Sequence, residues 1–168
     1  LLKILKKKSK TTSGIDNTFY KNTLEKNGHN FFSSFDDVIK VKKKFDIIFS
    51  LSELEHKYDP VSFLKKMKKA LSNSGRIVLR IPNYENIYSM ILGKDYYKYD
   101  YRTSHNYYFS DSNLNILFKR VGLKIESKIG FHEYEFNHLL AYARTKKRVN
   151  GSYKNIFNKK DENIIKKN

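Results

Sequence analysis

The chain has 168 residues, of which 39% are hydrophobic and 15% aromatic, so it can bury the core of one domain. It has no cysteine, which excludes disulfide frameworks and thiolate metal sites. The formal net charge of +17 suits a polyanionic partner, but the lysines are spread over the whole sequence, which equally fits a general compositional bias.

The sequence carries no sign of membrane insertion or export. No apolar run approaches the roughly 18 residues that a membrane span needs. The first eight residues, LLKILKKK, are too short and too charged for a signal peptide. We therefore expect a cytoplasmic protein without a membrane span.

The N-terminal part predicts short alternating elements. Residues 1–8 place apolar side chains opposite lysines, which predicts an amphipathic helix. Residues 14–16 predict a short strand that ends on an acid, and residues 19–26 predict a helix that a glycine terminates. Residues 31–35 mark the next extended segment, and residues 36–39 predict one helical turn.

The middle of the chain predicts a strand, a crossover helix and a second strand. Residues 45–50 form a continuous apolar run that is typical of a buried parallel strand. Asp59 and Pro60 begin a helix, because the carboxylate caps free amides and proline gives up only a donor that has no helical partner. The helix ends at residues 72–75, and residues 76–81 predict the second strand. Together they predict a right-handed βαβ unit with parallel strands.

The last third is less regular. Residues 84–109 are rich in tyrosine and poor in periodicity, which favours a mobile cover over a pocket rather than a sheet. Residues 110–122 predict a helix with an apolar stripe and a glycine stop, and residues 123–129 predict a strand. Residues 137–148 predict a further helix, and residues 152–168 predict a loosely held polar tail.

The histidines do not predict a metal site. The sequence contains His29, His56, His105, His132 and His138. No two of them have the close spacing of HxxxH or HExxH. We therefore expect no bound metal.

Three motifs in this order resemble one enzyme family. FDIIFSLSELEHKYDP (45–60) resembles the segment around the fourth strand of class I S-adenosylmethionine-dependent methyltransferases, whose pattern is roughly FDxIxxxxxLEHxxDP. SGRIVLRIPN (74–83) resembles the fifth strand with its glycine turn. HNYYFS (105–110) and the helix after it resemble the segment before the sixth strand. The resemblance runs approximately from residue 14 to residue 130.

The resemblance implies an α/β fold, namely an incomplete Rossmann-like three-layer sandwich with a mostly parallel sheet. The family's first strand and its glycine-rich loop have no counterpart from Leu1 onward, since the chain contains no GxGxG. We therefore expect a partial methyltransferase domain over residues 1–150, with residues 84–109 as a cap or substrate-side insertion and residues 151–168 as a polar tail. Without that loop, the chain alone should have little or no cofactor affinity.

The resemblance also implies a binding site for S-adenosylmethionine. Asp16 falls where the family binds the ribose hydroxyls, and one carboxylate can accept hydrogen bonds from both. The competing role for Asp16 is to cap the following helix. The residues that fall near the adenine are Ser34, Phe35 and Asp36, and Phe35 suits a plain core position equally well. Ser50 and Leu51 fall where the chain turns under the methionine portion of the cofactor.

His56 and His105 are the ionisable groups that we expect nearest the transferred methyl group. Imidazole accepts a proton near neutral pH, so either histidine suits a general base toward a hydroxyl or amine acceptor. An equally strong alternative is that His56 fixes the turn while Glu55 caps or pairs locally. Methyl transfer mainly needs an in-line approach without water, so positioning alone can suffice.

The function that the resemblance implies is methyl transfer from S-adenosylmethionine to a small-molecule acceptor. The chief alternative is a nonenzymatic basic module that binds nucleic acid or another acidic partner through lysine-rich helices and tyrosines. An enzyme that methylates nucleic acid ranks lower, because the chain has neither an Asn-Pro-Pro-Tyr-type motif nor a cysteine nucleophile.

Overall fold

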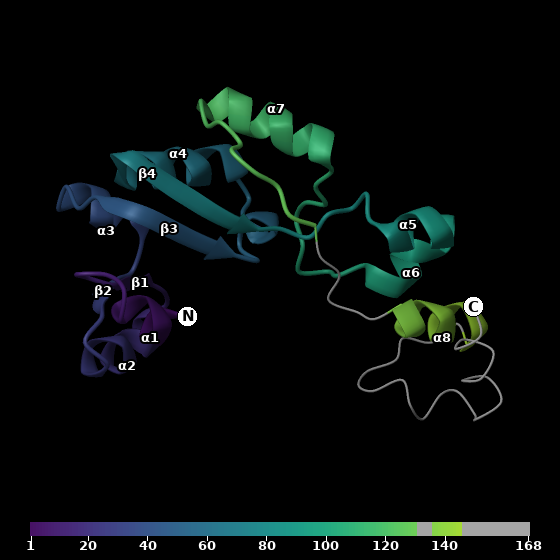
Figure 1. Cartoon of the computed structure of the whole chain (residues 1–168), viewed down its shortest axis with the longest axis horizontal. Helices are drawn as coiled ribbons and strands as arrows, with labels where there is room; N and C mark the ends of the chain where they lie inside the picture. Colours follow the sequence, from purple (N-terminus) through teal and green to yellow (C-terminus); the bar gives the residue numbers. More distant parts are fainter. Residues whose placement is uncertain (131–135, 146–168) are drawn as a thin grey trace.

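The computed structural model describes residues 1–130 and 136–145, and its strands form two separate parallel pairs. β1 (Ser13–Ile15) pairs with β2 (Asn30–Phe32), and β3 (Phe45–Leu51) pairs with β4 (Leu71–Arg80) (Figure 1). Helices and parallel strands alternate along the chain, which confirms the predicted α/β class.

The N-terminal end contains the first strand pair and its short helices (Figure 1). The predicted first helix forms as α1 (Leu2–Lys6). The next predicted helix forms as η1 (Thr18–Tyr20) and α2 (Lys21–Lys26). Gly28 follows with a φ of 73°, a conformation that glycine adopts without strain, and this turn lets the chain enter β2.

The extended segment that we predicted through Phe35 is shorter in the structure. β2 ends at Phe32, and Phe35 is already the first residue of α3 (Phe35–Lys40). The reason is the cap on this helix, because the Ser34 hydroxyl accepts the backbone N–H of Asp37 at 3.2 Å. The hydroxyl therefore starts the helix directly after the strand.

The βαβ prediction is confirmed. β3 is followed by η2 (Leu54–His56), α4 (Pro60–Ala70) and the parallel strand β4. The Asp59 carboxylate accepts the backbone N–H of Ser62 at 2.9 Å and so caps α4, as its sequence indicates. The register between β3 and β4 shifts near their start, where Phe45 pairs with Leu71 and Ile47 pairs with Arg76. The predicted helix stop at residues 72–75 therefore lies within this irregular start of β4.

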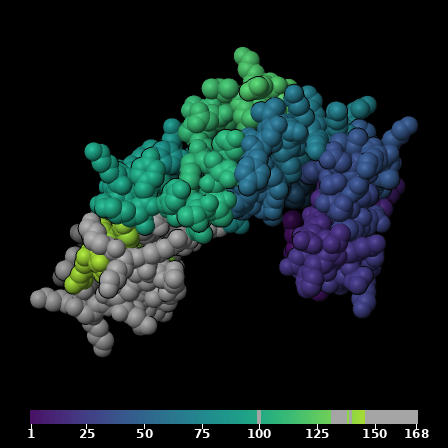
Figure 2. All heavy atoms as spheres, turned by 180° about the vertical axis from the view of Figure 1, so that it is seen from behind, coloured from purple at the N-terminus to yellow at the C-terminus, as the bar shows by residue number. Residues whose placement is uncertain are grey.

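The main core lies on one face of the β3–β4 pair, under α3, α4 and α7 (Asp111–Val121). In Figure 2 the green atoms of α7 lie against the blue atoms of α4, in agreement with the contacts between these two helices. The buried core residues are Val38, Ile48, Leu54, Leu64, Met67, Ala70, Phe109, Phe118 and Val121. The predicted apolar stripe of α7 therefore packs against the main core.

The opposite face of the β3–β4 pair carries no helical layer from the described residues. Ile47, Leu51 and Val78 alternate with the core-facing positions, and they are 53%, 43% and 43% exposed. The described residues thus form the predicted sandwich in an incomplete state, with helices on one side of this sheet.

Residues 84–109, which we predicted to be a cover rather than part of a sheet, are helical in part. They contain α5 (Ile87–Leu92), η3 (Gly93–Asp95) and α6 (Tyr96–Asp100). The Asn86 side chain starts α5 by accepting the backbone N–H groups of Tyr88 and Ser89. Tyr88 and Tyr96 then pack with Tyr142 of α8 (Phe136–Thr145) into a second, smaller core.

The strand predicted at residues 123–129 does not form. Within the part of the chain that the structure describes, the segment after α7 has no neighbouring strand with which to complete a ladder. Leu123 and Ile125 pack against the main core instead, and Glu126 forms an ion pair with Arg76 at 2.8 Å. The predictions for residues 146–148 and 152–168 lie outside the described residues.

Among residues 1–130 and 136–145, no helix combines the length and the apolar character that a membrane crossing requires.

Candidate active site

Asp16 is the first residue after β1, and it is exposed. Its carboxylate accepts the backbone N–H of Asn17 at 2.7 Å. The cap of η1 is provided by Asn17, whose side chain accepts the backbone N–H of Phe19 at 3.1 Å. The capping role that competed for Asp16 thus belongs to its neighbour, and the Asp16 carboxylate is accessible to solvent.

The three residues that we predicted near the adenine have partners within the protein. Ser34 caps α3, and Phe35 contacts Phe63 edge to face with 5.7 Å between the ring centroids. Asp36 forms an ion pair with Lys66 at 2.6 Å. The contacts of Phe35 and Asp36 join α3 to α4, and Ser34 begins α3, so all three side chains support the fold.

Asp37 completes the cap of α3. Its carboxylate accepts hydrogen bonds from the hydroxyl groups of Ser33 and Ser34, and these bonds hold the pKa of Asp37 below its ordinary value of 3.8. Because the pKa of Asp37 is lower in the folded state than in the unfolded state, the ionised carboxylate stabilises the fold at pH values above the unfolded-state pKa. That stabilisation disappears as the pH falls through the lower, folded pKa.

Asp37→Asn should therefore lower the urea midpoint of unfolding at about pH 6, and the difference from the natural protein should shrink at a pH below 3.8. Urea titrations at the two pH values, followed by circular dichroism, measure this. Glu25→Gln, which alters an exposed carboxylate of α2, is the control and should change neither midpoint. A difference that does not vary with pH would contradict the assignment.

Ser50 and Leu51 end β3 and face opposite sides of the sheet, as successive strand residues do. Ser50 is buried on the core side, and its hydroxyl has no hydrogen-bond partner among the described residues. Leu51 is 43% exposed on the other side. Ser52 then takes a φ of 56° and donates its backbone N–H to the Arg80 carbonyl at 2.9 Å, so the chain turns sharply beyond the strand.

The turn after β3 is joined to residues 104–108, about fifty positions later in the chain. The backbone N–H groups of Asn106 and Tyr107 donate to the Glu55 carbonyl at 2.9 and 3.2 Å. The Asn106 side chain donates to the His56 carbonyl at 2.8 Å, and the Tyr107 hydroxyl donates to the Tyr58 carbonyl at 3.0 Å. These four bonds fix the two segments against each other.

His56 and His105 are neighbours in the fold. Their rings meet edge to face with 4.9 Å between the centroids. Nδ1 of His56 lies 2.7 Å from the Ser104 carbonyl, which can only accept a hydrogen bond. Nδ1 therefore carries the proton in the neutral ring, and Nε2 keeps a lone pair that can accept a proton or bind a cation.

Glu55 lies beneath the two histidines, and its side chain is 1% exposed. Neither carboxylate oxygen has a hydrogen-bond partner among the described residues. The local cap or ion pair that we considered for Glu55 is thus not formed. This cluster offers three possible metal-ligand atoms, one each from Glu55, His56 and His105, and these atoms lie within 4.8 Å of one another.

A row of aromatic rings continues from the histidines toward α5 and α6. His105 contacts Tyr108 at 5.4 Å, and Tyr108 contacts Tyr84 at 6.4 Å between ring centroids. The hydroxyl groups of Tyr84 and Tyr97 are 2.7 Å apart, and this hydrogen bond raises the pKa of Tyr84. Tyr84 and Tyr97 also line a hollow of about 480 Å³ beside α5. We refer to His105, Tyr108, Tyr84 and Tyr97 as the aromatic row.

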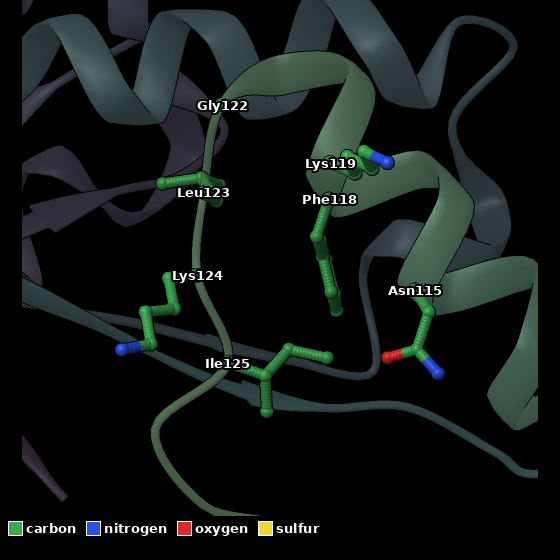
Figure 3. A pocket seen from close by; sticks show the side chains of 7 residues that line it. All are labelled: Asn115, Phe118, Lys119, Gly122, Leu123, Lys124 and Ile125. Atoms are coloured by element: carbon green, nitrogen blue, oxygen red, sulfur yellow. The ribbon is translucent and has the colours of Figure 1, made fainter.

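A second hollow of about 460 Å³ lies beside α7 (Figure 3). It lies between the helix and the segment where the predicted strand is missing. Its lining residues are Asn115, Phe118, Lys119, Gly122, Leu123, Lys124 and Ile125. It contains no carboxylate or histidine and none of the predicted site residues, so we do not assign the chemistry of the protein to it.

The structure does not bring all the predicted site residues together. His56 and His105 meet beyond the end of β3, which Ser50 and Leu51 form. Asp16 follows β1 instead, and Ser34, Phe35 and Asp36 lie at the start of α3. Sequence reasoning did not include Glu55 among the site residues. Its position directly before His56 in the LEH motif was the available signal.

Parallel strands alternate with helices, and polar groups gather beyond the carboxyl end of β3, which is where α/β proteins bind their ligands. A comparison with protein families matches a methyltransferase domain over residues 1–128. The chain belongs to this methyltransferase-domain family, which confirms the predicted class I resemblance. The comparison with curated proteins finds no match.

Proposed function

We propose that this methyltransferase-family chain belongs to a cytoplasmic enzyme that transfers a methyl group from S-adenosylmethionine to a small molecule. The observation that carries the proposal is the histidine pair at the carboxyl end of β3, within a chain that matches a methyltransferase domain. The lysines are scattered along the sequence, so they favour no nucleic-acid surface in particular.

For the cofactor, we propose that the Asp16 carboxylate binds the ribose hydroxyls. Its exposure and its place directly after β1 support this role. The proposed adenine contacts are Ser34, Phe35 and Asp36. We propose that Ser50 and Leu51 lie under the methionine portion, where the left-handed turn at Ser52 carries the chain away from β3.

For the acceptor, we propose that His56, His105 and the aromatic row form the binding surface. Residues 84–109 would then act as the substrate-side cap of a partial domain that spans residues 1–150. The hydrogen bonds from residues 104–108 to the turn after β3 support this arrangement, because they hold the cap against the strand end. The proposed histidine role is to contact the acceptor, and positioning supplies the in-line geometry.

The test is a transfer assay with S-adenosylmethionine that carries a labelled methyl group. The protein, expressed from its whole coding sequence, would be offered small hydroxyl- and amine-bearing aromatic compounds and, separately, oligonucleotides. We expect label in a small molecule, together with one S-adenosylhomocysteine for each methyl transferred. Label that appears only in oligonucleotides, or no transfer to any acceptor, would contradict the proposal.

A further inference from the structure

Glu55 is a buried acid without a neutralising partner in the described residues. Its side chain is 1% exposed, and neither oxygen accepts a hydrogen bond there. The nearest lysine along this turn, Lys57, pairs with the exposed Glu53 at 2.6 Å instead. A buried carboxylate without hydrogen bonds or a counter-charge is unfavourable, so this position suits a bound cation.

The surroundings of Glu55 suit a metal ion. One nitrogen from each of His56 and His105 and one oxygen of Glu55 lie within 4.8 Å of one another. Ligand atoms at about 2.0–2.2 Å from a shared ion lie roughly 3–3.5 Å from each other. Side-chain rotations that move these atoms by about an ångström would bring all three into coordination distance.

The hydrogen bond made by Nδ1 of His56 also supports a metal site. Metal-bound histidines commonly donate the other ring N–H to a carbonyl or carboxylate, which fixes the tautomer and the ring orientation. Nδ1 of His56 makes such a bond to the Ser104 carbonyl at 2.7 Å. Nε2 is therefore presented with its lone pair available on a ring that is already held in place.

The cluster is also accessible and firmly held. Glu55 is buried, whereas His56 and His105 are half-buried, so an ion can enter past the two rings. The hydrogen bonds from Asn106 and Tyr107 keep the segment that carries His105 beside the turn that carries Glu55. Little reorganisation is needed to bind an ion.

We propose that Glu55, His56 and His105 bind one first-row transition-metal dication, such as Zn²⁺, Fe²⁺ or Mn²⁺. Two imidazoles favour these ions over Mg²⁺ and Ca²⁺, which prefer oxygen ligands. Three protein ligands leave coordination positions for water. In this site the nitrogens of His56 and His105 bind the metal rather than accept a proton. Metal binding therefore takes the place of the general-base role that the sequence suggested for these histidines.

This site departs from the expectation of no bound metal, which depended on histidine spacing along the chain. His56 and His105 are far apart in sequence, and the fold brings them together. The inference goes beyond the proposed methyl transfer and does not depend on it, because metal binding can be measured without any substrate.

The test is calorimetric titration of the untagged, chelator-treated protein with Zn²⁺, Mn²⁺ and Mg²⁺. We expect one Zn²⁺ per chain with a dissociation constant of about a micromolar or below, and weaker binding of Mg²⁺. Glu55→Gln should weaken Zn²⁺ binding by at least about a hundredfold. Glu53→Gln, which removes an exposed carboxylate from the same turn, should leave it unchanged.

Absence of Zn²⁺ binding by the natural protein would overturn the proposal, as would equal affinity in Glu55→Gln. Circular dichroism establishes whether that variant folds. If Glu55→Gln does not fold, His105→Gln tests the same ligand set, because His105 is half-buried and lies in residues 104–108 rather than in the turn after β3. X-ray absorption of the Zn²⁺ complex should show only nitrogen and oxygen ligands with two imidazoles, and a shell without imidazole would also overturn the proposal.

Discussion

Asp16→Ala should weaken the binding of S-adenosylmethionine by about 1–3 kcal/mol, which is roughly a 5- to 150-fold rise in the dissociation constant. The physical reason is that an ionised carboxylate can accept hydrogen bonds from both ribose hydroxyls, and alanine leaves these hydroxyls without a protein acceptor. Calorimetric titration of the protein expressed from its whole coding sequence measures the effect.

Two comparisons make the Asp16 result decisive. Glu25→Ala removes an exposed carboxylate from α2, in the same N-terminal part of the fold, and should leave the affinity unchanged. Asp16→Asn keeps one acceptor oxygen and should fall between alanine and the natural residue. Unchanged affinity in Asp16→Ala would remove Asp16 from the cofactor site.

Leu64→Ala should lower the free energy of unfolding by about 2–5 kcal/mol, because it removes a fully buried side chain and leaves a cavity. Leu64 is 0% exposed, and it lies on α4 in the main core with Val38 and Ile48. Domains of this kind are stable by only about 5–15 kcal/mol, so the variant should unfold at much lower urea concentration.

The matched control for Leu64 is Ile116→Ala on α7. Ile116 is 68% exposed, so its replacement should change the free energy of unfolding by no more than about 0.5 kcal/mol. Urea titrations of both variants measure the difference. Similar midpoints for the two variants would mean that α4 does not pack on the β3–β4 pair as described.

The βαβ unit was predictable because its signals are local. The apolar run at residues 45–50 and the Asp59-Pro60 pair define a buried strand and a capped helix without help from distant residues. The same holds for α7, whose serine cap and glycine stop lie at its two ends. Parallel pairing then follows from the length of the crossover.

Elements that depend on distant partners were not predictable. The strand expected at residues 123–129 has suitable residues, but none of the described strands lies beside it to supply hydrogen bonds. The helices within residues 84–109 were missed because Tyr88 and Tyr96 are buried against Tyr142, which lies beyond the cap in sequence. Their apolar surface has no periodicity of its own to reveal this packing.

The candidate site was predictable in part. The LEH motif placed His56 beyond a strand, and the family resemblance placed His105 on the same side. The burial of Glu55 and the hydrogen bond from His56 to Ser104 could not be read from the sequence, because both depend on how residues 104–108 fold back on the turn. For the same reason, spacing along the chain gave no indication of a metal site.

The central claim is that the carboxyl ends of β1 and β3 hold S-adenosylmethionine. A crystal structure of the protein expressed from its whole coding sequence, with S-adenosylhomocysteine bound, tests it most directly. We predict both ribose hydroxyls within hydrogen-bond distance of the Asp16 carboxylate and the homocysteine portion beside Ser50 and Leu51. A cofactor bound away from these residues, or a saturated crystal without bound cofactor, would contradict the claim.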